Sequence, residues 1–150
     1  MNFLSKRSLL GIAAVADVAL YARPSPVAAK ALAARHHLPP RHLETLLQGL
    51  VQANILKGVR GPRGGYELAR ERRKITVGEI ARTVMAMSAA DAEESGASSK
   101  LVKKVIEPSV RKAGESFLAN LDAITIEDLC AAAVAARILD DETSEGDFAI

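Results

Sequence analysis

Hydrophobic residues recur along residues 40 to 52 at spacings of three and four, directly after a Pro39-Pro40 pair. This spacing places them on one face of an α-helix that begins at the prolines. The apolar stripe consists of Leu43, Leu46, Leu47, Leu50 and Val51. The opposite face is polar and consists of Arg41, His42, Glu44, Thr45, Gln48 and Gln52. The pattern therefore predicts a helix with one buried and one exposed face.

A shorter helix is predicted just upstream. Ser25 would cap its first turn and Pro26 would occupy its first position, followed by the run VAAKALAARH. His36-His37-Leu38 would then connect it to the helix of residues 40 to 52. Two helices joined by such a tight connection predict a helix-turn-helix.

The segment from Lys57 to Leu68 reads KGVRGPRGGYEL and predicts a β-hairpin. Val59 and residues 66–68 would form its strands. Its turn would contain Gly61, Pro62, Gly64 and Gly65, since glycine adopts the positive φ angles of tight turns. Arg60 and Arg63 supply positive charge that attracts a phosphodiester backbone. A hairpin after a helix-turn-helix is a wing, so the predicted fold is mainly α with a small β-hairpin wing.

The N-terminal run from Leu9 to Ala22 follows Lys6 and Arg7, as in a secretory signal. Asp17 interrupts the run, which at about 14 residues is also too short to cross a bilayer. We therefore predict a core helix and no membrane association. Its apolar face would consist of Leu9, Ile12, Ala13, Ala16, Val18 and Leu20.

The second half of the chain predicts three more helical segments. Thr76 to Glu79 match a capping box for a helix through about Met87, and a polar stretch then predicts a mobile loop. Apolar spacing resumes at Lys100, with a discontinuity expected near Glu107 because Pro108 follows. Thr125 would cap a last helix to about Leu139. The resulting division is 1–87 for the DNA-binding domain, 88–99 for the loop, 100–139 for dimerisation helices and 140–150 for an acidic tail.

Charge separates the same two halves. Residues 1–80 hold 13 Lys and Arg against 5 Asp and Glu, a net charge of +8, whereas residues 81–150 hold 7 against 13, a net charge of −6. A basic half attracts a polyanion. Aromatic residues make up only 3% of the chain, which favours duplex DNA over single strands that stack on aromatic side chains. One cysteine, Cys130, fits a reducing cytoplasm.

Other functions fit the sequence less well. A phosphate-binding Walker loop would need a lysine and a hydroxyl residue opening a helix, but Tyr66 to Leu68 continue as strand. No nucleophile, base and orienting group occur at a recognisable spacing, so we expect no catalysis. Two alternatives stay open: a protein-interaction module recruited by a partner enzyme, and a thiol-responsive regulator acting through Cys130.

Three segments together resemble the Rrf2 family of bacterial transcription regulators, the group that includes IscR, NsrR and CymR. They are LPPRHLETLLQGLVQANILKGVRGPRGGYELAR (Leu38–Arg70), ITVGEIA (Ile75–Ala81) and LDAITIEDL (Leu121–Leu129). The resemblance implies a homodimer with two winged helix-turn-helix units, a long crossing dimerisation helix and a partly palindromic operator. The expected role is that of a sequence-specific repressor.

The resemblance also assigns DNA contacts. The recognition helix would present Arg41, His42, Glu44 and Thr45 to the major groove, and Arg60 with Gly61 to Gly65 would form the wing tip. Arg63 stands where the family often has a small residue and would add a minor-groove or phosphate contact. The full expected set is Ser25, Pro40, Arg41, His42, Glu44, Thr45, Gln48, Arg60, Gly61, Arg63, Gly64 and Gly65.

Cofactor chemistry is where the chain departs from the family. Cluster-binding members carry three cysteines in the loop that corresponds to Asp91–Lys100, and that segment has none. We expect no iron–sulfur cluster, no other metal and no cofactor. Cys130 is expected to pack as a small hydrophobic residue, with Glu127 and Asp128 raising its pKa. The effector is left open among a small ligand, a partner protein and thiol chemistry.

Overall fold

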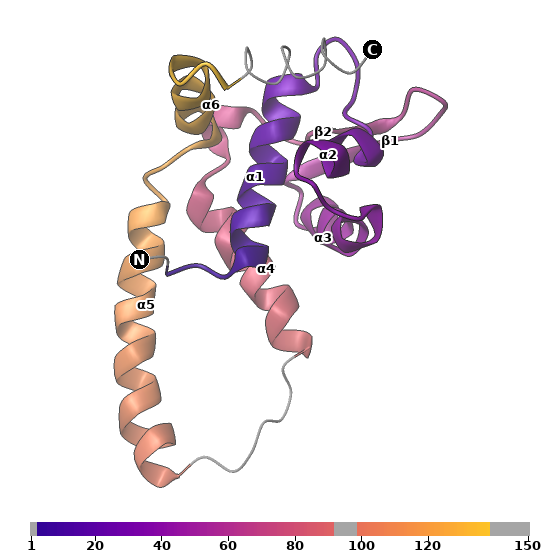
Figure 1. Ribbon diagram of the computed structural model, residues 1–150. Helices are drawn as coiled ribbons and strands as arrows, with labels where there is room; N and C mark the ends of the chain where they lie inside the picture. The colour runs from indigo at the N-terminus through magenta and orange to yellow at the C-terminus, as the bar shows by residue number, and fades with distance from the viewer. Residues whose placement is uncertain (1–2, 92–98, 139–150) are drawn as a thin grey trace.

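The computed structural model describes residues 3–91 and 99–138 (Figure 1). The elements in chain order are α1 (Lys6–Tyr21), α2 (Ala29–Arg35), α3 (Pro40–Gln52), β1 (Leu56–Val59), β2 (Gly65–Leu68), the 3₁₀ turn η1 (Arg72–Lys74), α4 (Val77–Asp91), the π-helical turn η2 (Val102–Ile106), α5 (Glu107–Leu121) and α6 (Ile126–Ala135). This confirms the predicted fold class, mainly α with one β-hairpin. In the part of the chain that is described, no helix has both the length and the apolar composition that crossing a membrane requires.

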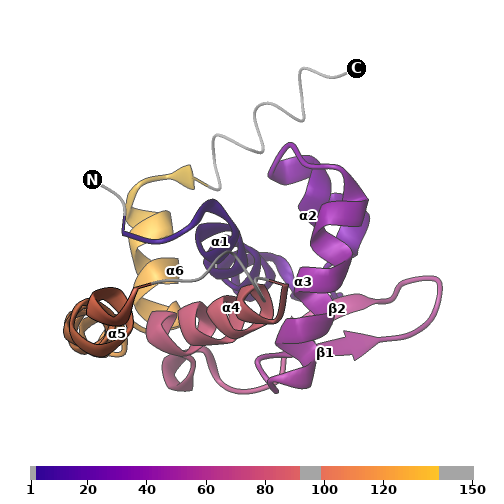
Figure 2. The same cartoon turned by 90° about the horizontal axis from the view of Figure 1, so that it is seen from below.

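Helix α1 lies at the centre of the molecule. Figures 1 and 2 show α2, α3 and the hairpin together on one side of it and α5 on the other. Helix α4 packs against α1 and α3, and α6 packs against α1. Gly11 permits the close approach of α1 and α4, because a Cβ there would lie 2.7 Å from Val84 Cγ2.

The expected core helix at the N-terminus is confirmed, but its predicted buried face was largely wrong. The buried face carries Ala14, Val15 and Val18, whereas Leu9 is 41% exposed. Apolar residues occupy almost every side of this helix, so their spacing fits more than one face. Contacts with α3, α4 and α6 decide which face is buried.

The predicted start of the second helix was wrong. Helix α2 begins at Ala29, its N-cap is Ala28, and the exposed Ser25 does not cap it. Val27 instead pairs with Tyr66, exchanging N–H···O=C hydrogen bonds of 2.9 and 2.8 Å. This pairing holds the segment before α2 extended against the hairpin, so the helix cannot begin at Pro26.

Helix α3 agrees with the prediction at its ends and at four of its five apolar positions. Leu43, Leu46, Leu47 and Leu50 are buried, whereas Val51 is partly exposed at the edge of the stripe. The 13-residue helix therefore presents its polar face to solvent, because the leucines fix its rotation.

The second half of the chain differs from prediction in the lengths of its helices. Helix α4 runs to Asp91, four residues past the predicted end, and the rest of the expected loop lies outside the described residues. The predicted discontinuity near Glu107 is confirmed: the Glu107 N–H donates to the Val102 carbonyl, five residues back, in a π-helical turn just before Pro108. The acidic tail also lies outside the described residues.

Helix α6 begins as predicted and joins the core. Thr125 and Asp128 form a capping box, and the Thr125 N–H holds the pKa of Asp128 below its usual range. The helix ends at Ala135, earlier than the predicted Leu139. Ile126 and Cys130 lie in the same hydrophobic core as α1 and α3. Helix α6 therefore completes the core of the winged helix.

Candidate nucleic-acid interface

The outer face of α3 carries the polar residues that the sequence predicts as DNA contacts. Arg41, His42, Glu44, Thr45 and Gln48 are all exposed, and Pro40 occupies the first turn. Their neighbours on the inner face are fully buried leucines. A rigid helix with exposed arginine, glutamate, threonine and glutamine side chains can donate to and accept from base edges in a major groove.

The connection between α2 and α3 is tight. His37 adopts a positive φ of 53°, and the Leu38 N–H donates to the Ala33 carbonyl at 3.0 Å. Helix α3 then starts at Pro40. The turn fixes the direction in which α3 leaves α2, which is the geometry of a helix-turn-helix.

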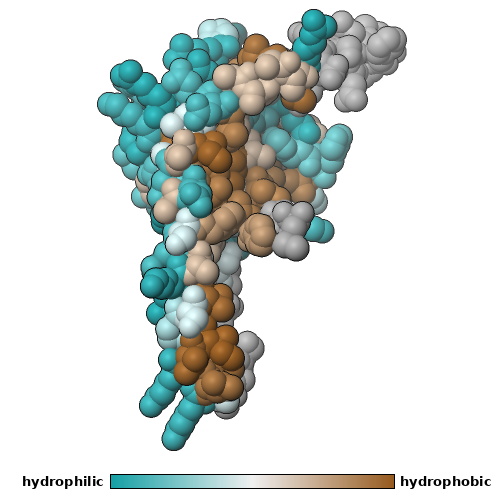
Figure 3. Space-filling view, turned by 90° about the vertical axis from the view of Figure 1, so that its left-hand side faces the viewer, coloured by the Kyte–Doolittle hydropathy of each residue, from teal (hydrophilic) through white to brown (hydrophobic). Residues whose placement is uncertain are grey.

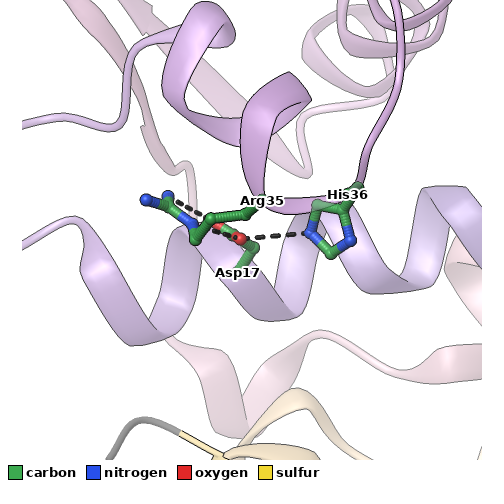
Figure 4. A network of polar contacts seen from close by, with 3 residues as sticks. All are labelled: Asp17, Arg35 and His36. Atoms are coloured by element: carbon green, nitrogen blue, oxygen red, sulfur yellow. Dashed lines mark hydrogen bonds and ion pairs between the residues drawn. The ribbon is translucent and has the colours of Figure 1, made fainter. Parts of the chain in front are cut away.

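A buried carboxylate supports this turn, and the sequence analysis missed it (Figure 4). Asp17 on α1 is 5% exposed and accepts from Arg35 Nε at 2.8 Å and Nη2 at 2.6 Å. It also lies 3.1 Å from His36 Nε2. The Arg35 guanidinium stacks over the Tyr21 ring at 4.1 Å. The sequence signal for this cluster was Asp17 itself, a charged residue within an apolar helix. A buried charge is normally paired, so its position indicated that partners must lie nearby in the fold.

The predicted hairpin is confirmed, and its two strands are antiparallel. Leu56 pairs with Leu68 and Val59 pairs with Gly65. Gly61 has a φ of 117°, a conformation that favours glycine. A Cβ on Gly64 would lie 2.3 Å from the Val59 carbonyl oxygen, so the turn closes only with glycine at that position.

The wing tip carries the predicted cations. Arg60 and Arg63 are both exposed. Figures 1 and 2 show the hairpin beside α2 and α3, with its tip projecting away from the body of the molecule. The base of the wing is fastened by Arg70, which donates to the Asn54 carbonyl at 2.9 Å and pairs with Glu79 on α4. The wing is therefore held rigidly to the core while its charged tip projects into solvent.

Cys130 lies apart from this surface. It is 3% exposed in the core, and burial raises the pKa of its thiol above the ordinary value although Arg72 acts in the opposite direction. Packing as a small hydrophobic residue is confirmed. The raised pKa keeps the sulfur protonated and poorly nucleophilic near neutral pH.

The helix-turn-helix, the charged wing and the polar outer face of α3 together define a winged-helix DNA-binding protein. Residues 4–132 match the Rrf2 family, described as iron-dependent transcriptional regulators. The chain belongs to the Rrf2 family, and it is a DNA-binding transcriptional regulator.

Individual relatives agree with this assignment. The slr0846 protein of Synechocystis sp., named as an HTH-type transcriptional regulator, is 33% identical over 127 residues, covering 84% of this chain and 86% of the relative. IscR of Vibrio atlanticus is 35% identical over 81 residues, and the match spans 47% of that protein. Two solved structures are similar: IscR of T. potens (TM-score 0.65, 35% identity, 88% of each chain) and CymR of B. subtilis (TM-score 0.64, 27% identity, 88% of this chain and 98% of CymR).

The family description names iron, so the available ligands matter. A cluster is held mainly by thiolates, and the single thiol of this chain is buried in the core. Within residues 3–91 and 99–138, His, Cys, Asp and Glu form no group of three or more that could hold a metal ion. The residues present do not fit an iron–sulfur cluster.

Proposed function

We propose that the protein acts as a homodimeric, sequence-specific repressor on a partly palindromic operator. Helix α3 enters the major groove of each half-site, and Arg60 and Arg63 on the wing contact the neighbouring backbone and minor groove. A dimer bound across a promoter prevents RNA polymerase from binding there. The protein acts by binding alone, without a catalytic step, in the cytoplasm where the chromosome lies.

The observation that carries the dimer is the helical arm formed by η2 and α5. η2 contributes 5 residues to the arm and α5 contributes 15, and none of them is buried. Apolar residues nevertheless line it: Leu101 just before it is 61% exposed, Val105 55% and Val110 64%. Figure 3 shows this hydrophobic surface running from the foot of the arm towards the body of the molecule.

A second copy of the chain is the occupant that best suits this arm. Helix α5 contacts the body of the molecule at α4, but the apolar residues of the arm stay exposed. An exposed apolar stripe on a helical arm of about 30 Å requires a partner. Two identical stripes related by a two-fold axis cover each other. The same axis would place two α3 helices on one duplex, which supports a partly palindromic operator.

Specificity is assigned to α3, and this assignment can be tested directly. Operators are first selected from random DNA with the wild-type protein. Glu44→Ala and Thr45→Ala should then each relax discrimination at one base pair of each half-site by about 1–3 kcal/mol, because a direct base contact is lost. Binding to a panel of single-base operator variants measures this loss.

Gln52→Ala is the matched control, because Gln52 is exposed on the same helix but at its C-terminal end. It should leave the base preferences unchanged. Glu44→Ala and Thr45→Ala proteins that bind all operator variants more weakly by the same factor would remove α3 from base recognition.

A further inference from the structure

A basic cleft separates the start of α1 from the start of α3. Its volume is about 670 Å³. Its polar lining residues are Lys6 and Arg7 from α1 and Arg41, His42 and Thr45 from α3. Two elements that lie far apart in the sequence thus direct cationic side chains into one space.

The apolar residues that line this cleft are Leu10 and Leu38. None of the described residues that line it is acidic. Lys6 and Arg41 are both exposed and both line the cleft. Two cations that share an open cleft repel one another, and an anion between them relieves that repulsion. The lining therefore favours a negatively charged ligand.

The helix dipole does not explain the position of Lys6. This residue stands in the first turn of α1, where the helix dipole disfavours positive charge, and that turn has no acidic residue. A side chain that goes against such a local preference is typical of a functional surface. Lys6 is exposed, so its charge is available to a ligand.

The cleft is continuous with the DNA-reading face, because Arg41, His42 and Thr45 belong to both. Figures 1 and 2 show the start of α1 and the hairpin on different sides of α3. A helix in the major groove has a phosphate backbone on either side. With α3 in a major groove, the wing would face one of these backbones and the cleft would face the other.

We propose that Lys6 binds a backbone phosphate of the operator on the side of α3 away from the wing. This inference rests on the proposed function. It assigns a phosphate contact to the N-terminal residues, outside both the helix-turn-helix and the wing. The contact adds affinity equally for all sequences, because it is made to the backbone and not to a base edge.

The test is a salt titration of DNA binding by the full chain carrying Lys6→Ala. Each lost phosphate contact should lower the slope of log K against log salt by about 0.9 per protomer. Between 50 and 200 mM salt, the ratio of variant to wild-type Kd should therefore shrink about threefold per protomer. The effect should be the same on selected and random DNA.

Two variants serve as controls. Lys112→Ala removes the same charge from an exposed site on α5 and should leave the slope unchanged. Lys6→Arg keeps the charge and should retain the wild-type slope. Because Lys6 is exposed, the melting temperature of Lys6→Ala should match the wild type.

The inference is overturned if Lys6→Ala keeps the wild-type slope, or if Lys112→Ala lowers it equally. The proposed function fails in a different way. In that case the wild-type protein itself would show no preference between selected and random DNA, whatever the slopes of the variants.

Discussion

At the turn before α3, one carboxylate connects three elements. Asp17 on α1 accepts from Arg35 at the end of α2 and lies within hydrogen-bonding distance of His36 in the turn. The position of α3 on the surface depends on this turn. A buried ion pair of this kind fixes geometry, because removing one partner leaves the other charge poorly solvated.

Asp17→Ala should lower the free energy of unfolding by about 3 kcal/mol. This value is the lower end of the range for breaking a buried ion pair, because solvent partly reaches Arg35 and His36. Urea denaturation measures this loss. Asp122→Ala breaks the exposed pair with Arg82 and should cost far less. Equal losses in the two variants would show that the Asp17 pair has no special role in the fold.

Single residues also show what the sequence could not predict. Asp17 was identified as an interruption of an apolar run, but its partners lie 18 and 19 positions away, and local spacing does not show such contacts. Ser25 has the chemistry of a helix cap, yet the pairing of Val27 with Tyr66 prevents the helix from starting there. Its expected DNA contact stays a prediction.

At the level of elements, the local sequence predicted the structure correctly where it clearly favoured one buried face of a helix, one type of turn or one helix cap. Four buried leucines determined the orientation of α3, glycines determined the hairpin, and Thr125 determined the start of α6. Prediction failed for the buried face of α1, because its small apolar residues fit several faces equally well. Helix ends were also displaced, because tertiary contacts decide how far a helix continues.

The wing depends on glycine at one position more than at others. Gly64→Ala should weaken DNA binding at least tenfold, because the new Cβ would overlap the Val59 carbonyl and open the turn that carries Arg60 and Arg63. Fluorescence anisotropy with a selected operator measures the change.

Gly58→Ala is the control in the same hairpin, since a Cβ at Gly58 would meet no atom within 4 Å. It should bind DNA as the wild type does. If Gly64→Ala also binds normally, the wing contributes little to affinity.

For the whole molecule, the basic half of the sequence forms most of the winged helix, with a net charge of +8 over residues 1–80. The described residues of the second half are close to neutral, with 7 Lys and Arg against 6 Asp and Glu in 81–91 and 99–138. The excess positive charge of the first half directs a polyanion towards α3 and the wing. The exposed apolar arm was predictable from its spacing, whereas the packing of α6 into the core was not, because it depends on contacts between residues far apart in sequence.

The arm leads to a prediction about assembly. Val110→Glu places a charge in the middle of the apolar stripe and should shift the protein from dimer to monomer, raising the dimer dissociation constant by at least tenfold. Ala119→Glu is the matched control. Ala119 is also exposed, but nine residues or about two and a half turns further along α5, on the opposite face. It should leave the dimer intact.

Sedimentation equilibrium of the wild-type protein, alone and bound to a selected operator, tests the central claim most directly. The account predicts a mass of twice 15.9 kDa for the free protein and two chains on each operator, both reduced to one chain by Val110→Glu. A wild-type protein that sediments as a single chain, and binds its operator as one, would contradict the account.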